Sequence, residues 1–242
     1  FADVIPSQSL GGKELERLNS LNIADALRYF SGLQVKDYGG VGGIKTVNIR
    51  SMGSQHLGVY YDGIELGNAQ NGQIDLGQFS LDNIEEVTLY NGQKSSLMQT
   101  ASDYGNAGSV YLRTRQPRFK GGETHHLKGK VKYGLSNMLC LSMLYEQRFS
   151  DNVNGSFSLG TVTSDGKYQF RYMRKNSDGT TAYDTTAVRQ NGDIQSLRLE
   201  GNVNGTIERG AWNVKAYTYL SNRGIPGAIV NNVWRREERQ AD

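Results

Sequence analysis

The sequence is poor in the residues that mark several common protein classes. Its 242 residues include 1 cysteine, 3 histidines, 3 prolines and 5 methionines. The single cysteine, Cys140, excludes a disulfide within the chain, and we interpret it as a small apolar residue of a strand. No apolar run approaches the roughly 20 residues of a transmembrane helix. We therefore expect no membrane span of that kind.

The net charge and the first residues bear on two further features, nucleic-acid binding and a signal peptide. The formal net charge is +3 and the pI about 8.8. Lysine and arginine form no run along a helix, so we predict no nucleic-acid partner. The opening residues, Phe1-Ala2-Asp3, lack the basic region and apolar core of a signal peptide, which is expected of a mature form.

Glycine and tyrosine are abundant, with 30 and 14 copies. This composition favours β structure. The hydrophobic fraction of 37% is low for a compact soluble domain. A barrel wall explains that value, because half of its residues face a polar lumen.

Before Pro117 the pattern is mixed. The stretch Asn22–Leu33 has apolar residues at helical spacing, with Asn22 as N-cap and Gly32 as the stop. Shorter helical turns are predicted within residues 12–19 and 81–84. The Gly-rich stretch 38–43 reads as a loop, and strands are predicted at 46–50, 57–61, 86–90 and 110–114.

After Pro117 the period becomes two. Leu127, Val131 and Tyr133 alternate with lysines, so one face is apolar and the other cationic. We predict about six strands of the length that a tilted membrane strand needs, joined by tight turns and by a long polar loop over residues 176–192. A soluble β-sandwich with alternating faces is the competing interpretation of this half.

The order of segments in the first half resembles the plug domain of TonB-dependent outer-membrane receptors. Five stretches carry the likeness, in the right order: NIADALRYFSGLQV (22–35), VNIRS (47–51), VYYDGI (59–64), IEEVTLYNG (84–92) and YGNAGSVYL (104–112). The stretch 93–103 is longer than the family pattern, and the glycine run after Tyr104-Gly105 is thinned.

The resemblance implies a fold and a domain division. We expect an α+β plug over residues 1–117, followed over residues 118–242 by antiparallel strands of a transmembrane β-barrel. Plugged barrels close at about 22 strands, so we expect the barrel to be incomplete here. We find no TonB box and expect it upstream of residue 1.

The resemblance also implies a function. The full protein would import a scarce nutrient across the bacterial outer membrane, with TonB, outer-membrane lipid and the small-molecule nutrient as its partners. It would be no enzyme and need no cofactor. Cobalamin, ferric siderophores and haem are all open as substrates; the Gly-rich first loop resembles cobalamin receptors. The alternative is a soluble β-rich binding or adhesion module without transport.

Two plug loops are predicted to face the ligand, because glycine lets backbone approach closely and the polar side chains donate and accept hydrogen bonds. The predicted ligand-binding residues are Tyr38, Gly39, Gly40, Lys45, Gln55, His56, Asn68, Gln70, Asn71 and Gln73. A second set is predicted to form charge pairs with the barrel wall: Arg50, Glu85, Glu86 and Lys94.

Other chemistries were weighed against simpler roles. His125 and His126 point to opposite faces of an extended chain, so we predict a solvated turn there and no metal site. Ser109 lacks the pattern of a nucleophile elbow, and Asp62 before Gly63 is a turn residue. Tyr145, Phe149, Tyr168 and Trp212 are predicted to lie at the membrane boundary.

Overall fold

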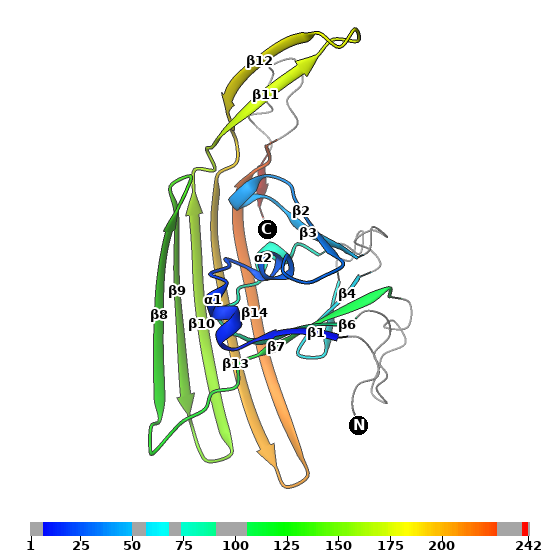
Figure 1. Ribbon diagram of the computed structural model, residues 1–242. Coiled ribbons are helices and arrows are strands. Elements are labelled where there is room, and N and C mark those ends of the chain that lie inside the picture. Colours follow the sequence, from blue (N-terminus) through cyan, green and yellow to red (C-terminus); the bar gives the residue numbers. More distant parts are fainter. Residues whose placement is uncertain (1–6, 50–56, 68–73, 91–105, 227–238, 242) are drawn as a thin grey trace.

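The computed structural model describes residues 7–49, 57–67, 74–90, 106–226 and 239–241. Five long antiparallel strands stand side by side in one curved sheet, and the N-terminal half lies against the concave face of that sheet (Figure 1). We call the five strands the wall and the described residues 7–114 the plug. No helix in the described residues is long and apolar enough to cross a membrane.

The plug is built on a five-stranded sheet with the order β1-β6-β7-β4-β5. Its strands are β1 (Ser7–Gly11), β4 (Leu57–Tyr61), β5 (Ile64–Leu66), β6 (Ile84–Tyr90) and β7 (Gly108–Thr114). Neighbours pair antiparallel except β4 and β7, which are parallel. A separate hairpin joins β2 (Leu33–Asp37) to β3 (Lys45–Ile49). These strands include all those predicted for the first half.

Two short helices, α1 (Lys13–Arg17) and α2 (Ile23–Leu27), cover the plug sheet. The Asn22 side chain caps α2 by accepting a hydrogen bond from Asp25 N at 3.0 Å, as predicted. The α-helix is shorter than the predicted 22–33. Residues 28–30 change to the tighter i→i−3 hydrogen bonds, and Gly32, at φ 85°, ends the helical segment.

One apolar core holds the plug together. Ile23 and Leu27 of α2 are fully buried against Ile49, Val87 and Leu89 of the strands. Burial of side chains of this size stabilises a fold by about 1.5–3 kcal/mol each. The plug is thus a folded unit by its own packing, and its contact with the wall is a separate matter.

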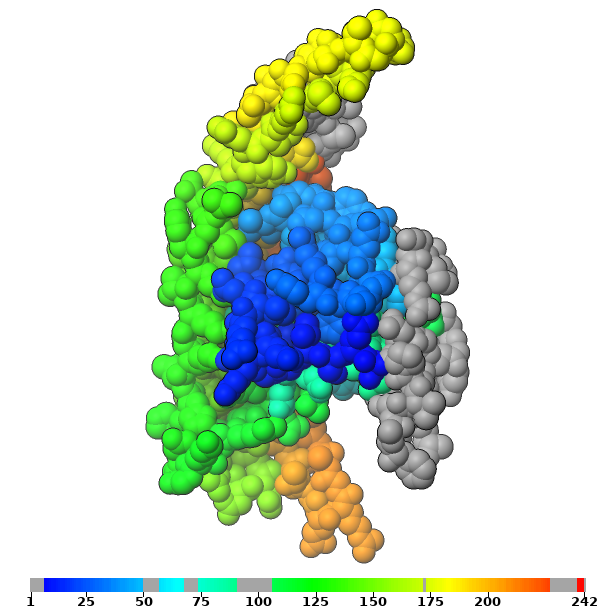
Figure 2. Space-filling model, in the orientation of Figure 1, coloured from blue at the N-terminus to red at the C-terminus, as the bar shows by residue number. Residues whose placement is uncertain are grey.

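The wall consists of β8 (His125–Gly134), β9 (Met138–Arg148), β10 (Val153–Ser164), β13 (Ile194–Ile207) and β14 (Gly210–Gly224), with a short β15 (Arg239–Ala241) paired to β14. The predicted alternation holds, because Val131, Tyr133 and Val214 are exposed on the outer face while the lysines of β8 face the plug. Figure 2 shows the plug seated over much of the inner face.

The segment between β10 and β13 differs from expectation. We predicted a wall strand around residues 168–172 and a loop over 176–192. Instead β11 (Gln169–Lys175) pairs with β12 (Thr181–Val188) in a separate hairpin that extends beyond the wall (Figure 1). Alternation identifies a strand but not its partner, and the Thr- and Tyr-containing stretch 181–188 suits a strand. At the opposite end of the wall the turns are short.

The four aromatic residues predicted at the membrane boundary lie at two different ends of the wall. Tyr145, Phe149 and Trp212 are 37–63% exposed and flank the short turns of the wall. Tyr168 lies at the base of the extending hairpin, where its ring is placed against Gly40 of the plug. Tyr168 therefore belongs to the mouth of the structure, at the end where the hairpin projects.

Candidate functional site

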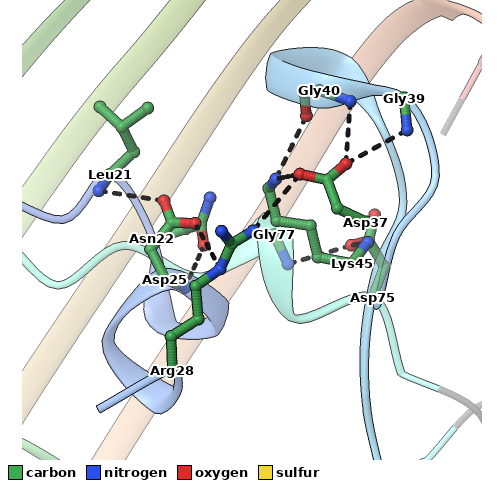
Figure 3. A network of polar contacts seen from close by, with 10 residues as sticks. All are labelled: Leu21, Asn22, Asp25, Arg28, Asp37, Gly39, Gly40, Lys45, Asp75 and Gly77. Carbon is green, nitrogen blue, oxygen red and sulfur yellow. Dashed lines mark hydrogen bonds and ion pairs between the residues drawn. The ribbon is translucent and has the colours of Figure 1, made fainter. Parts of the chain in front are cut away.

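The loop between β2 and β3 is held in shape by a carboxylate. Asp37 Oδ1 accepts hydrogen bonds from the backbone N of Gly39 at 3.1 Å and of Gly40 at 2.8 Å (Figure 3). Gly39 and Gly40 have φ angles of 148° and 77°, which glycine adopts readily. We call residues 38–44 the apical loop, since it lies near the end of the wall from which the hairpin projects.

Lys45 supports this loop from below. Its side chain is 6% exposed and its Nζ lies 2.5 Å from Asp37 Oδ2 and 3.2 Å from the carbonyl oxygen of Gly40. Its backbone N donates to Asp75 Oδ1 at 3.0 Å. The prediction of Lys45 as a ligand contact is therefore corrected, because its ammonium is buried and already paired.

Asp75 connects the apical loop to the wall. Its second oxygen lies 2.7 Å from Arg223 Nη1 of β14, and both side chains are less than 10% exposed. Asp75 thus accepts from the backbone of Lys45 and from a wall guanidinium at once. A charge-assisted pair of this kind fixes both position and orientation.

The loop glycines are needed for close contact with the wall. A Cβ on Gly39 would lie 2.8 Å from Pro226 Cγ, and one on Gly42 would lie 3.0 Å from Ile194 Cβ and 3.1 Å from the Gly192 carbonyl oxygen. We had predicted that these glycines admit a ligand. In the structure, those at 39 and 42 admit the ends of β13 and β14.

A recess opens beside the apical loop. Tyr38, 56% exposed, lines it from the plug, and Tyr168, 42% exposed, lines it from the hairpin base. The Arg189 side chain, just after β12, donates from Nη2 to the carbonyl oxygen of Pro226, just after β14, at 2.7 Å. The full lining is Asp37, Tyr38, Gly39, Gly40, Tyr168, Arg189, Ile225 and Pro226. Two exposed rings and a guanidinium suit a ligand with a planar face.

A buried polar cluster joins the plug to the middle of the wall. The carboxylate of Glu200 on β13 is 5% exposed and accepts from Tyr61 Oη at 2.9 Å and from Asn83 Nδ2 at 3.0 Å. Lys215 on β14 lies 3.3 Å from Glu200, pairs with Asp62, and sits 3.6 Å above the Tyr61 ring. Burial and the adjacent carboxylate raise the pKa of Tyr61 far above its ordinary value, so Tyr61 stays a hydrogen-bond donor.

Three lysines of β8 form a second joint with the plug. Lys128 Nζ lies 2.7 Å from Glu16, Lys130 Nζ lies 2.7 Å from Asp82, and Lys132 Nζ donates to the Ser20 carbonyl oxygen at 2.9 Å. We call this row the lysine ladder. The side chains alternate along the strand, so all three reach the same face.

The carboxyl groups of this joint respond to the lysines. The hydrogen bond from Lys128 holds the pKa of the Glu16 carboxyl below its ordinary 4.5. Burial raises the pKa of the Asp82 carboxyl, but the hydrogen bond and charge of Lys130 outweigh burial and bring it below 3.8. Both carboxylates are therefore ionised, and paired, at neutral pH.

Several predicted site residues lie outside the described residues: Arg50, Gln55, His56, Asn68, Gln70, Asn71, Gln73 and Lys94. Tyr38, Gly39 and Gly40 do line one recess. The described ion pairs of Glu85 and Glu86 go to Arg113 of β7 and to Arg118 just after it. These described pairs therefore join β6 to β7 and to the segment after β7, and they do not reach the wall strands.

The residues that fasten the plug were missed. Glu200 and Lys215 stand at polar positions of an alternating pattern, which by itself assigns them no role. A charged residue at an inward position of a strand is costly to bury without a partner. That cost is a signal in the sequence, but the partner across the interface is not visible there.

We predict that Glu200→Ala loosens the plug by about 3 kcal/mol, because it leaves the buried Tyr61 hydroxyl and Asn83 amide without the acceptor that they share. Amides of residues 57–66 should exchange hydrogen faster in this variant than in the parent protein. Glu208→Ala, at the exposed turn after β13, is the matched control. Equal exchange in both variants would contradict a fastening role for Glu200.

The lysine ladder should weaken in acid. A carboxyl with a lowered pKa in the folded state stabilises fully above its ordinary pKa and stops doing so as pH falls through the folded value. Above pH 5, Lys128→Met with Lys130→Met should therefore speed exchange in residues 13–20. The difference between the variant and the parent should shrink as pH falls through the lowered folded-state pKa values, and a difference that does not change with pH would show that the carboxylates are not involved.

Comparisons with known proteins agree with this arrangement. Residues 4–105 match the model of the TonB-dependent Receptor Plug Domain. The vitamin B12 transporter BtuB of Vibrio vulnificus (strain YJ016) is 25% identical over 212 residues, which cover 85% of this chain and 30% of that protein. The chain thus spans about a third of the length of this relative.

Solved structures share the fold. The copper transporter OprC superposes with a TM-score of 0.65 at 15% identity, over 92% of this chain and 32% of OprC. The ferric yersiniabactin uptake receptor FyuA from Yersinia pestis gives 0.58 at 15% identity, over 90% and 32%. Residues 4–105 thus match the plug domain of TonB-dependent receptors, and the described chain shares its fold, a plug against a concave wall of strands, with solved transporters and receptors of that architecture.

Proposed function

We propose that the full-length protein imports a scarce nutrient across the outer membrane in a TonB-dependent manner, with the plug gating the lumen. The observation that carries this proposal is the polar fastening of the plug. Its joints to the wall are ion pairs and hydrogen bonds around Glu200, Arg223 and the lysine ladder. Polar joints exchange with water at lower cost than an apolar seal, so the plug is held and remains displaceable.

The outward side of the wall supports a membrane setting. Leu127, Val131 and Tyr133 of β8 and Val214 of β14 are each more than 60% exposed. Leu141 of β9 and Phe157 of β10 are also exposed on the strands between them, so apolar side chains continue across the outer face. Lipid is the natural contact for such a band. A soluble binding module, the alternative, would pack this face inward. We also propose that the plug ends and the wall begins near Pro117, between β7 and β8.

Cobalamin is the first substrate to test, because the relative that matches most of this chain is a vitamin B12 transporter. A ferric siderophore is the second candidate, since the fold is shared with a siderophore uptake receptor. We propose that the recess lined by Tyr38, Tyr168 and Arg189 receives a planar group of the ligand.

Uptake by cells decides the proposal. A strain that lacks its own B12 transporter should grow on nanomolar cobalamin when it carries the full-length gene, and only with functional TonB. Growth on a ferric siderophore instead would assign the second substrate. If cells take up neither ligand and the mobility of the protein on a gel does not depend on heating, the binding module is favoured.

The recess should contribute directly to ligand affinity. An aromatic contact contributes about 0.5–1.5 kcal/mol, so Tyr38→Ala and Tyr168→Ala should each weaken ligand binding by about 2- to 12-fold. Tyr29→Ala is the control, because Tyr29 is an equally exposed plug tyrosine that does not line the recess. Titration of purified receptor by tryptophan fluorescence measures the change, and unchanged affinity in both recess variants would remove the recess from the binding site.

A further inference from the structure

The segment that joins the plug to the wall, residues 115–124, is attached to the first two wall strands by a cluster of charged groups. Arg115 lies at its start, and its Nε is 3.3 Å from Glu146 Oε1 of β9. The backbone of Thr124, at its end, accepts from Arg148 N at 2.8 Å. We call these ten residues the linker. It passes close to the end of β8, where His126 lies.

His126 stands between two carboxylates. Its Nε2 is 2.9 Å from Glu123 Oε2 of the linker, and its Nδ1 is 3.4 Å from Glu146 Oε2. The ring of Phe119, also in the linker, stacks on the imidazole at 4.9 Å between centroids. Two linker side chains therefore contact His126: Glu123 at the edge of the imidazole ring and Phe119 on its face.

The geometry selects one form of the imidazole. A carboxylate only accepts hydrogen bonds, and a neutral imidazole has one N–H donor, whereas the imidazolium has two. Both ring nitrogens of His126 face carboxylate oxygens, so only the imidazolium satisfies both contacts. The other oxygen of Glu146 lies 3.3 Å from Arg115 Nε, so the linker and His126 contact the same carboxyl group.

The surrounding charges are few. Glu123 and Glu146 favour the imidazolium, while Arg115 opposes it from the far side of Glu146. Lys128 is the next residue on the same face of β8, and its ammonium is paired with Glu16. His125 is exposed and its ring contacts Thr124 Oγ1 instead. The neighbouring histidine therefore has no part in the cluster.

We propose that His126 is a protonation-dependent latch that fastens the linker to the wall. With the imidazolium present, Glu123 and Phe119 hold the linker against β8. Loss of the proton removes one of the two donors, and the contact with Glu123 or with Glu146 is lost with it. The latch is closed at low pH and opens as pH rises through the range in which histidine titrates.

The mobility of the linker tests this directly. A nitroxide placed by Lys120→Cys, an exposed linker position, in the full-length receptor with Cys140→Ser reports local motion between pH 5 and 8.5. We expect the mobile fraction to rise severalfold with pH. His126→Gln should abolish the titration, because glutamine does not change charge, and His125→Gln should leave it intact.

Glu123→Gln provides a second arm, since Glu123 is exposed and its loss does not endanger the fold. This variant should have a mobile linker at every pH. A spectrum of the parent that does not change with pH, a titration that survives His126→Gln, or one that disappears in His125→Gln would each overturn the latch. None of these readings depends on substrate or transport, so they fail or succeed independently of the proposed import function.

Discussion

The structure depends on the inward face of the wall being polar. Side chains alternate between the two faces of each wall strand, and Lys130, Arg198 and Glu200 are among the inward residues that bond to the plug. Tyr217 adds an aromatic contact by stacking on Phe79. The plug must therefore complete its own apolar core and offer polar partners outward. It does both: Ile23, Leu27 and Leu89 are fully buried within it, while Asp75, Asp82 and Tyr61 point at wall side chains.

The joints differ in how much water they exclude. Glu200 and Arg223 are about 95% buried with their partners, so each needs its counterpart to remain in place. The lysine ladder is partly exposed, with Lys128 43% accessible, and surface pairs of this kind contribute about 0–1 kcal/mol. Fastening is therefore strong at β13 and β14 and weak at β8, close to where the linker enters.

Much of this fold was predictable because local patterns record which face of an element is apolar. The alternation of Leu127, Val131 and Tyr133 with lysines, and the cap at Asn22, both appear as predicted. The pairing of β11 with β12 was not predictable, since alternation carries no information on the neighbour. The sequence predicted only part of the recess. Tyr38 was expected to face the ligand, whereas Tyr168 and Arg189 reach the recess because they flank the hairpin, whose pairing the sequence does not show. Lys45 resembled a ligand contact until its pairing with Asp37 was known.

The length of the last wall strands sets the height of the mouth. Strands β13 and β14 have 14 and 15 residues, whereas a tilted strand crosses the hydrocarbon layer with about 9–11. Both strands therefore exceed that length by several residues. Ile225 and Pro226, just past the end of β14, line the recess, so the recess lies beyond the last paired residues of the longest wall strand. Under the proposed import function, an incoming molecule would meet Tyr38 and Tyr168 before it reaches the polar joints between the plug and the wall.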